Sequence, residues 1–450
     1  MPLHDYFREF AGKRVALLGL ARSNLPLIEP LHFVGAKLIL CDENTEFQQL
    51  PQWRAMGCEL YLGDGYLDGW DADVIIRTPG IRPDVGRLPE MVASGTIVTS
   101  EMELFMDRCP CMTYGVTGSD GKTTTTSIIA TVVKQSGIKT WLGGNIGTPL
   151  LPQIDQIGSG DCAVLEISSF QLMGMKKSAD IAVLTNISPN HLDWHIDYDE
   201  YKRAKETIFK WQTVEQTVVL NRDNYESYKL HDRAKGNVVT FSIDNDADIT
   251  VKNGKLTAFN TEIMDIAGWK LPGRYNIENL LAAVGAVWGN VPTNFIAEAV
   301  ESFKGVEHRL EWVSKCNGAN FYNNSIATSP SRVIASLKAF DRKIILIAGG
   351  AEKGIGFDEL AKVLPQYTKH VILTGNNAAN SIETAAKLVF GCPPISRVDD
   401  MQQAVTLAAE IAGDGDIVAL MPACTAFDAY RDFAERGEDF KRLVRELCSD

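Results

Sequence analysis

The amino-acid sequence predicts an α/β protein of three domains. Its 450 residues are more than one ordinary hydrophobic core can organise. Short apolar, strand-like runs alternate with helix-like segments from end to end, which is typical of parallel sheets covered by helices. We place the domains at residues 1–107, 108–304 and 305–450.

Composition and charge exclude several classes of protein. Apolar residues make up 45% and charged residues 22%, which is normal for a globular protein. The net charge of −13 gives no electrostatic footprint for nucleic acid or an anionic membrane. Residues 1–11 lack a signal-peptide pattern, and no apolar run approaches the roughly 18 residues of a membrane span. We therefore expect a cytoplasmic protein without nucleic-acid or membrane partners.

The cysteines indicate thiols rather than a disulfide framework. There are nine, an odd number scattered from Cys41 to Cys448. Cys109 and Cys111 form a C-x-C pair, but no second pair stands at the spacing of zinc ligands. The sequence favours buried thiols over a zinc site.

The first turn, Gly19–Asn24, follows an expected strand at 14–18. Ala21 and Asn24 stand where a dinucleotide fingerprint needs its second and third glycines, so a nicotinamide or flavin dehydrogenase is disfavoured. The helix N-terminus after the turn can still bind another diphosphate, and Asp42, ending the strand that starts at 37, can hold a ribose or base. An ordinary turn with a surface aspartate is the open alternative. Further strands are expected at 74–76 and 97–98.

Thr117–Thr124, with the sequence TGSDGKTT, lies between an expected strand at 112–116 and an expected helix at 123–134. Glycines in such a turn let backbone N–H groups approach phosphate at the helix N-terminus. The pattern departs from the full Walker A motif, because Val116 stands where its first glycine belongs. The context favours a phosphate-binding P-loop over a plain glycine turn.

The P-loop side chains suit a nucleotide triphosphate. Lys122 adds a mobile positive charge, and the Thr123 hydroxyl can ligate the magnesium that accompanies ATP. The candidate ATP-binding residues here are Gly118, Ser119, Asp120, Gly121, Lys122, Thr123 and Thr124.

Two further polar residues follow buried-type strands, Glu166 after 162–165 and His191 after 181–184. Because the carboxyl ends of parallel strands converge on the ligand crevice, both can reach the P-loop's metal. For Glu166 the alternative is a solvated carboxylate, and for His191 it is a hydrogen-bonded structural residue.

The rest of the chain adds a small β excursion and a third α/β unit. Residues 236–270 carry Asn253-Gly254, which predicts a type I′ hairpin. In the last unit, Gly349–Gly354 follows the first expected strand and contains Lys353. This turn can hold an anionic group, although an exposed connection fits equally well. The strands expected in this unit are 343–348, 370–374 and 416–421.

Several motifs in the same order make the whole chain resemble the Mur ligase family. The motifs are Gly118–Thr124, Gly143–Gly147 (GGNIG), Leu165–Leu172 (LEISSFQL), Tyr201–Lys205, Gly273–Asn279, His308–Glu311, Pro422–Cys424 and Asp428. The resemblance implies a Rossmann-like UDP-binding domain, a central P-loop ATPase-type domain with a parallel sheet, and a C-terminal Rossmann-like domain.

The resemblance also implies the activity. ATP would drive ligation of D-glutamate to UDP-N-acetylmuramoyl-L-alanine through an acyl phosphate, in peptidoglycan synthesis. We expect ATP and two Mg²⁺ ions as cofactors, a carbamylated Lys205, small-molecule substrates only, and a monomer.

By the same resemblance, residues acquire roles. The catalytic set is Lys122, Glu166, His191 and Lys205. The metal ligands are Thr123, Glu166, His191 and Lys205. Further ATP contacts are Asn276, Asn279 and Arg309. The UDP-sugar contacts are Leu20, Ala21, Asp42 and Asn145. The amino-acid contacts are Thr328, Lys353 and Phe433.

Departures from the family pattern concern the amino-acid pocket. The usual D-S-K-A-T-N segment reads Asn324–Ser329 with Ile326 at the lysine position, and Ala426 replaces a serine. A backbone N–H, a water or Ser325 would have to supply the missing donors. Asn190 also stands where the family usually has an aspartate. Two alternatives stay open: a ligase of the same fold that adds L-glutamate or another amino acid, and a non-catalytic regulator that binds UDP-sugar or ATP.

Overall fold

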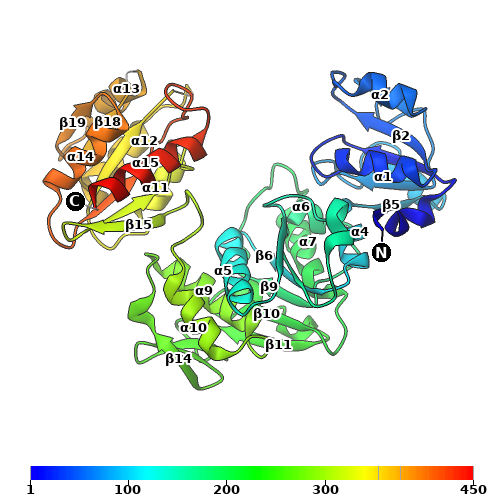
Figure 1. Ribbon diagram of the computed structural model, residues 1–450, viewed down its shortest axis with the longest axis horizontal. Helices are drawn as coiled ribbons and strands as arrows, with labels where there is room; N and C mark the ends of the chain where they lie inside the picture. Colours follow the sequence, from blue (N-terminus) through cyan, green and yellow to red (C-terminus); the bar gives the residue numbers. More distant parts are fainter. Residues whose placement is uncertain (1, 353, 376, 449–450) are drawn as a thin grey trace. The chain divides into compact units, whose positions relative to one another are not determined.

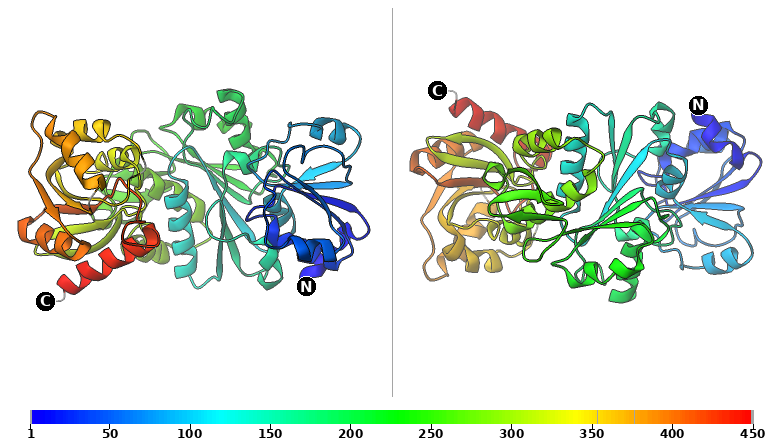
Figure 2. Two further views of the ribbon diagram at one scale, coloured as in Figure 1. Left: turned by 90° about the horizontal axis from the view of Figure 1, so that it is seen from above. Right: turned by 90° about the horizontal axis from the view of Figure 1, so that it is seen from below.

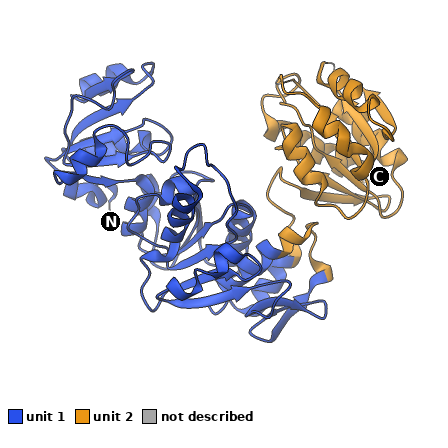
Figure 3. Cartoon of the chain, turned by 180° about the vertical axis from the view of Figure 1, so that it is seen from behind, with its two compact units in different colours: residues 1–266, 278–300 blue, residues 267–277, 301–450 orange. Residues whose placement is uncertain are grey.

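The computed structural model describes residues 2–352, 354–375 and 377–448, whose strands form three separate sheets (Figure 1). The chain divides into two compact units, one of residues 1–266 and 278–300 and one of 267–277 and 301–450 (Figure 3). The predicted α/β class with three parallel-dominated sheets is confirmed. The domain boundaries at 107/108 and 304/305 stay predictions. No helix in the described part of the chain is both long and apolar enough to cross a bilayer.

The N-terminal sheet has five parallel strands in the order β3-β2-β1-β4-β5. Alternate residues of β1 face opposite cores, Val15 and Leu17 on one side and Ala16 and Leu18 on the other. Both faces are therefore covered, as a parallel sheet requires. The elements are η1 Leu3–Phe10, β1 Arg14–Leu18, η2 Leu25–Leu27, α1 Ile28–Phe33, β2 Lys37–Asp42, α2 Leu50–Ala55, β3 Glu59–Leu62, β4 Val74–Arg77, α3 Leu88–Ala93, β5 Ile97–Thr99 and α4 Glu101–Arg108.

The central sheet has nine strands in the order β14-β13-β12-β11-β10-β9-β6-β8-β7. It is parallel from β7 to β12 and ends in an antiparallel β12-β13-β14 edge. Asn253 and Gly254 both have positive φ, which confirms the predicted type I′ hairpin. The strands are β6 Met112–Thr117, β7 Thr140–Gly144, β8 Cys162–Glu166, β9 Ile181–Leu184, β10 Thr217–Asn221, β11 Asn237–Phe241, β12 Ile249–Lys252, β13 Lys255–Ala258 and β14 Thr261–Asp265.

The helical elements between the start of β6 and residue 302 include two that carry most of the site, α5 and α7. The set is α5 Lys122–Gln135, η3 Leu151–Gln156, α6 Ser169–Leu172, α7 Tyr198–Lys210, α8 Tyr225–Tyr228, η4 His231–Arg233, η5 Ile266–Gly268, α9 Arg274–Val287 and α10 Thr293–Ser302.

The C-terminal sheet has six strands in the order β15-β16-β20-β17-β18-β19, with only β15 antiparallel. Ile344 and Leu346 of β17 pack into one core with α11, α12 and α13, whereas Ile345 and Ile347 pack into another with α14 and α15. The red helix α15 accordingly lies on the other side of the sheet from the gold helices (Figure 2). The elements are β15 Glu311–Cys316, β16 Ala319–Asn323, α11 Pro330–Leu337, β17 Ile344–Gly349, α12 Asp358–Tyr367, β18 Thr368–Thr374, α13 Asn377–Lys387, β19 Ile395–Val398, α14 Met401–Ile411, β20 Ile417–Leu420 and α15 Phe433–Leu447.

One cysteine pair departs from the sequence-based expectation of thiols. Cys316 at the end of β15 and Cys448 after α15 form a disulfide, with their Cα atoms 5.2 Å apart across a sequence separation of 132 residues. The pairing arises because α15 packs along β15, a contact that cysteine spacing does not reveal. Cys109 and Cys111 stay thiols with their Sγ atoms 3.5 Å apart.

A buried carboxyl joins α4 to the central sheet. Glu101, at the first position of α4, is 4% exposed, and its Oε1 accepts a hydrogen bond of 3.1 Å from the Leu151 N–H of η3. Burial raises the pKa of Glu101 to about 7, although the backbone hydrogen bond acts in the opposite direction. The folded protein therefore binds the Glu101 proton more tightly than the unfolded chain does.

This raised pKa predicts a pH dependence of stability. The contribution of Glu101 is most favourable below the unfolded value of 4.5 and is lost as pH rises toward about 7. We expect Glu101→Gln to gain free energy of unfolding relative to the wild type between pH 4.5 and pH 8, by up to about 3 kcal/mol. Urea unfolding of both proteins across this range measures it. Parallel pH curves would contradict the assignment.

Candidate nucleotide and metal site

The P-loop has the backbone that its glycines predict. It connects β6 to α5, and Gly118 and Gly121 have φ values of 155° and 82°. A Cβ atom on Gly118 would lie 1.8 Å from Thr185 Oγ1, and one on Gly121 would lie 2.0 Å from Asn279 Oδ1. Glycine is therefore required at both positions by conformation and by space.

The P-loop is held in shape by hydrogen bonds to the segment that follows β9 and to helix α7. Ser119 Oγ donates a hydrogen bond of 2.9 Å to the Ser188 carbonyl and lies 2.8 Å from the Tyr201 hydroxyl oxygen. Thr185 Oγ1 donates one of 2.6 Å to the Asp120 carbonyl. These hydrogen bonds fix the backbone of the loop in one conformation.

Two lysines meet on one carbonyl of the loop. Lys122 Nζ donates a hydrogen bond of 2.9 Å to the Gly118 oxygen, and Lys205 Nζ donates one of 2.7 Å to the same atom. Lys205 comes from α7, is 2% exposed and lies 4.6 Å from the Tyr201 ring. Burial, reinforced by the nearby Lys122 cation, holds the pKa of Lys205 well below its ordinary value. The site thus contains an amine that readily becomes neutral.

Glu166 ends β8 beside the loop and has one unused oxygen. The side chain is 2% exposed, and its Oε1 accepts a hydrogen bond of 2.7 Å from Asn145 Nδ2. Among the described residues, Glu166 Oε2 has no hydrogen-bond partner. A buried carboxylate with a spare oxygen is costly without a cation, so this donor fits a magnesium ion. The metal reading of Glu166 is favoured over that of a solvated carboxylate.

His191 lies in the loop between β9 and α7. Because β6 lies between β8 and β9 in the sheet, the P-loop is flanked by the segments that carry Glu166 and His191. His191 is exposed, has a φ of 54°, and its ring centroid lies 4.9 Å from that of Phe170. The His191 ring also lies 6.5 Å from that of Tyr201 on α7, centroid to centroid. Its role as a ligand stays a prediction.

Among the described residues, one compact group of His and Glu side chains could hold a metal ion, and it lies elsewhere, between the segment before β15 and helix α15. Glu307, His308 and Glu438 come together there. The ammonium of Lys441 lies 2.7 Å from Glu307 and 2.6 Å from Glu438, so this group is an ion-pair cluster with its own cation.

The first βα turn brings together three of the predicted UDP-sugar contacts. The Leu20 N–H, next to Ala21, donates a hydrogen bond of 2.5 Å to Asp42 Oδ2. Asp42 thus fixes the turn in addition to any ligand role. Asn145, the fourth contact, lies instead in the loop after β7, where the Arg22 guanidinium donates hydrogen bonds to the Gly144 and Gly147 carbonyls.

Asn24 was missed by the sequence analysis, which treated it only as an absent glycine. It is buried, and its amide lies within hydrogen-bonding distance of three carbonyls, those of Leu18, Gly19 and Ile76. The amide therefore clasps β1 to β4 at the turn.

The remaining predicted ATP contacts lie on α9 and before β15. Asn276 and Asn279 are one turn apart on α9, and both are buried. Asn279 Oδ1 accepts a hydrogen bond of 3.4 Å from Thr125 Oγ1, which places it against the P-loop helix. Arg309 lies between two residues of positive φ, His308 and Leu310.

Two of the three predicted amino-acid contacts lie within the described residues. Thr328 follows β16, Phe433 begins α15 and packs edge-on against His308, and Lys353 lies outside the described residues. The idea that Ser325 replaces the missing donors is wrong. Its hydroxyl is buried, donates 2.7 Å to the Phe433 carbonyl, and accepts from Arg436.

Arg436 was also missed by the sequence analysis. It is 3% exposed, and its guanidinium donates hydrogen bonds to the carbonyls of Ser325, Cys424 and Thr425. Burial lowers the pKa of Arg436 to about 10, which leaves it charged. The Arg436 cation therefore joins the two segments that differ from the family pattern, those containing Ile326 and Ala426. In the sequence, the one hint of this role is the Arg436-Gly437 pair within an amphipathic helix.

Comparison with known proteins identifies the family to which the chain belongs. The profile described as Mur ligase middle domain matches residues 116–287, and that described as Mur ligase, glutamate ligase domain matches residues 308–424. The chain belongs to the Mur ligase family.

Particular relatives narrow the comparison. The chain is 42% identical to the UDP-N-acetylmuramoylalanine--D-glutamate ligase of Acetivibrio thermocellus over 99% of both chains. Its fold is similar to the structure of UDP-N-acetylmuramoyl-L-alanyl-D-glutamate--2,6-diaminopimelate ligase, with a TM-score of 0.60 at 20% identity, over 98% of this chain and 92% of that one. It is also similar to the MurF ligase from Thermotoga maritima in complex with ADP, with a TM-score of 0.54 at 16% identity, over 98% and 96%.

The two glycines that flank α5 offer a matched test of the nucleotide site. Gly121 and Gly137 both have positive φ, but a Cβ on Gly137 would meet nothing within 4 Å. We expect Gly121→Ala to weaken ATP binding more than about tenfold, since it displaces the loop or Asn279. Gly137→Ala should cost only about 1 kcal/mol of stability. Calorimetric titration with ATP measures both, and equal affinities would contradict the site.

Proposed function

We propose that the protein ligates D-glutamate to UDP-N-acetylmuramoyl-L-alanine at the expense of ATP, in peptidoglycan synthesis. The observation that carries this proposal is the 42% identity with a ligase of that name along 99% of both chains. The P-loop and the buried side chains of Glu166 and Lys205 supply the chemistry that such a ligase needs. Their presence disfavours the alternative of a non-catalytic regulator.

The reaction proceeds in two steps. The alanyl carboxylate oxygen attacks the γ-phosphorus of ATP, the bond to the β-phosphate oxygen breaks, and ADP leaves. The amine of the amino acid then attacks the acyl carbon, phosphate leaves with the bonding electrons, and the amine loses a proton to form the amide. Both steps depend on neutralising charge and placing the reactants in line.

This chain's residues divide the work. Lys122 leaves its own loop carbonyls to meet the phosphate oxygens, and the N–H groups around Gly118 and Gly121 add fixed dipoles. Thr123 and Glu166 would hold one magnesium ion, and His191 with a carbamylated Lys205 would hold a second. Magnesium supplies charge neutralisation of the phosphates and of the attacking carboxylate.

Further residues of the chain would hold the substrates. Asn276, Asn279 and Arg309 contact the nucleotide. Leu20, Ala21, Asp42 and Asn145 contact the UDP-sugar. Thr328, Lys353 and Phe433 contact the amino acid. The monomeric state and the cytoplasmic location stay predictions.

A second candidate is a ligase for L-glutamate or another amino acid. It is favoured by Ile326 and Ala426, which remove a lysine and a serine from the usual pocket, and by Ser325, whose hydroxyl is already engaged. Backbone groups or water must then recognise the amino acid.

Phosphate release from ATP plus UDP-N-acetylmuramoyl-L-alanine, scanned over amino acids of both chiralities, tests the proposal. We expect D-glutamate to give the highest kcat/KM. Lys122→Ala is the control, because the loss of one preorganised charge donor should lower the rate about 10²- to 10³-fold in a folded protein. A higher kcat/KM with L-glutamate would support the ligase activity but refute D-glutamate as the amino-acid substrate.

Lys205 is expected to carry a carbamate. Its depressed pKa provides the neutral amine that reacts with CO₂, and the product is an anionic oxygen ligand. We expect ¹³CO₂ to label Lys205 in NMR spectra, and Lys205→Ala to be inactive and partly rescued by a short carboxylate such as formate.

Lys202 on the same helix is the matched control. Its ammonium is paired with Asp199 and Glu226, which raises the pKa of Lys202. Lys202→Ala should therefore keep both the label and the activity. A wild-type protein without label, together with an active Lys205→Ala variant, would refute the carbamate.

A further inference from the structure

The segment that carries His191 is a tight turn held by its own backbone. The N–H groups of Trp194 and His195 donate hydrogen bonds of 3.1 and 3.0 Å to the His191 carbonyl. The Ile196 N–H donates one of 3.0 Å to Glu200 Oε2, which ties the turn to the start of α7. His191 itself has a left-handed backbone, which few residues adopt without support. We call residues 191–196 the histidine turn.

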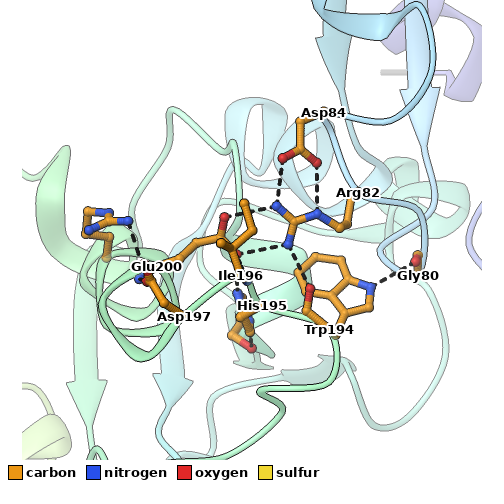
Figure 4. Close-up of polar contacts among 10 residues, drawn as sticks. Gly80, Arg82, Asp84, Trp194, His195, Ile196, Asp197 and Glu200 are labelled. Atoms are coloured by element: carbon orange, nitrogen blue, oxygen red, sulfur yellow. Dashed lines mark hydrogen bonds and ion pairs between the residues drawn. The ribbon is translucent and has the colours of Figure 1, made fainter.

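Arg82, in the loop that follows β4 of the N-terminal sheet, binds the histidine turn. Arg82 follows β4, and its guanidinium donates two hydrogen bonds of 2.9 Å to the two oxygens of Glu200 (Figure 4). It also donates 2.8 Å to the Trp194 carbonyl and lies 5.1 Å above the Trp194 ring. Asp84 accepts from the other edge at 2.7 and 2.8 Å. The fork geometry and partial burial make this the strong kind of ion pair.

Glu200 also contacts a second, buried histidine, His195. His195 is 2% exposed; its Nδ1 lies 3.1 Å from Glu200 Oε2, and its Nε2 lies 3.0 Å from Ser169 Oγ. Ser169 begins α6, three residues after Glu166. The Arg82 hydrogen bonds lower the pKa of Glu200 to about 2, so the carboxylate stays an anion. A chain of polar contacts therefore runs from Arg82 through Glu200 and His195 to Ser169, at the start of α6.

The loop that carries Arg82 also touches the UDP-sugar turn. Thr78, at its start, packs so closely on Gly19 that a Cβ there would lie 2.1 Å from Thr78 Cγ2. Trp194 Nε1 donates 3.2 Å to the Gly80 carbonyl farther along the loop. The same loop therefore adjoins the UDP-sugar turn at one end and the histidine turn at the other.

We propose that Arg82 is a positioning residue of the ligase, which holds the histidine turn through Glu200 and Trp194 so that His191 is ready to bind the second magnesium ion. The inference rests on the proposed function, in which His191 is a metal ligand. Arg82 touches neither substrate nor metal; it acts through Glu200, His195 and the turn. Removing a residue that hydrogen-bonds a metal ligand directly typically lowers metal affinity about 10- to 100-fold, and Arg82 lies one contact farther away, so we expect the lower end of this range.

The test compares Arg82→Ala, Arg82→Lys and Glu200→Gln with the control Arg14→Ala. Arg14 makes a similar bidentate ion pair with Glu59, but wholly within the N-terminal sheet. Mn²⁺ binding is followed by electron paramagnetic resonance with a non-hydrolysable ATP analogue and UDP-N-acetylmuramoyl-L-alanine. Mg²⁺ activation of phosphate release and amide hydrogen exchange of residues 190–197 complete the set.

We expect Arg82→Ala to weaken the second Mn²⁺ site and raise the Mg²⁺ requirement about tenfold, and to accelerate exchange in the histidine turn. The KM for the UDP-sugar should change less than about threefold. Arg82→Lys should recover part of the loss, Glu200→Gln should reproduce it, and Arg14→Ala should match the wild type.

Three outcomes would overturn the inference: unchanged Mn²⁺ binding in Arg82→Ala, a rise in the UDP-sugar KM alone, or an equal effect of Arg14→Ala. If Arg82→Ala does not fold, Arg82→Lys and Glu200→Gln decide by the same readouts. The variant His191→Ala separates the metal-binding role of His191 from the positioning role of Arg82. Two Mn²⁺ sites of wild-type affinity in His191→Ala would refute the proposed metal role, whereas a weakened site there with intact binding in the Arg82 variants would refute only the positioning role.

Discussion

The carbonyl oxygen of Gly118 is the point on which the centre of this protein depends, because it accepts hydrogen bonds from both Lys122 and Lys205. Two amines close to one atom repel each other as cations, and burial adds to the penalty. The arrangement is relieved by a phosphate that draws Lys122 away, or by a change of charge on Lys205. An asymmetry follows, in which one lysine stays a mobile cation and the other is suited to chemical modification.

Local turn chemistry made part of the structure predictable from sequence. The glycines at 118 and 121, the lysine at the helix start and the Asn253-Gly254 hairpin each act within a few residues, so their conformations follow from composition. β10 was not assigned from the sequence, and β11 was expected only as part of the β excursion at 236–270. Their place in the central sheet is decided by pairing with β9 and β12, which is a long-range matter.

The residues that sequence reasoning missed share a physical cause. Arg82 and Glu200 are 118 positions apart, and Arg436 reaches Ser325 across 111. Such pairs have no periodic or spacing signature, because tertiary folding alone brings them together. The Cys316–Cys448 disulfide belongs to the same class. The sequence did indicate where the site departs from its family, at Ile326 and Ala426, but the structure was needed to see that Ser325 is already engaged.

Asn24 has a consequence for attempts to redesign the first βα turn. Restoring glycine at Ala21 and Asn24 would recreate a dinucleotide-binding fingerprint on paper. In this chain it would also delete the amide that joins the ends of β1 and β4 through the carbonyls of Leu18, Gly19 and Ile76. The Leu18 carbonyl would keep its hydrogen bond from the Thr78 N–H, but the three carbonyls would lose the amide donor that they share, at a cost of about 1–3 kcal/mol. Cofactor exchange at this turn is therefore opposed by the junction between the carboxyl ends of β1 and β4, two interior strands of the sheet, and an engineer would have to rebuild that junction before changing ligand specificity.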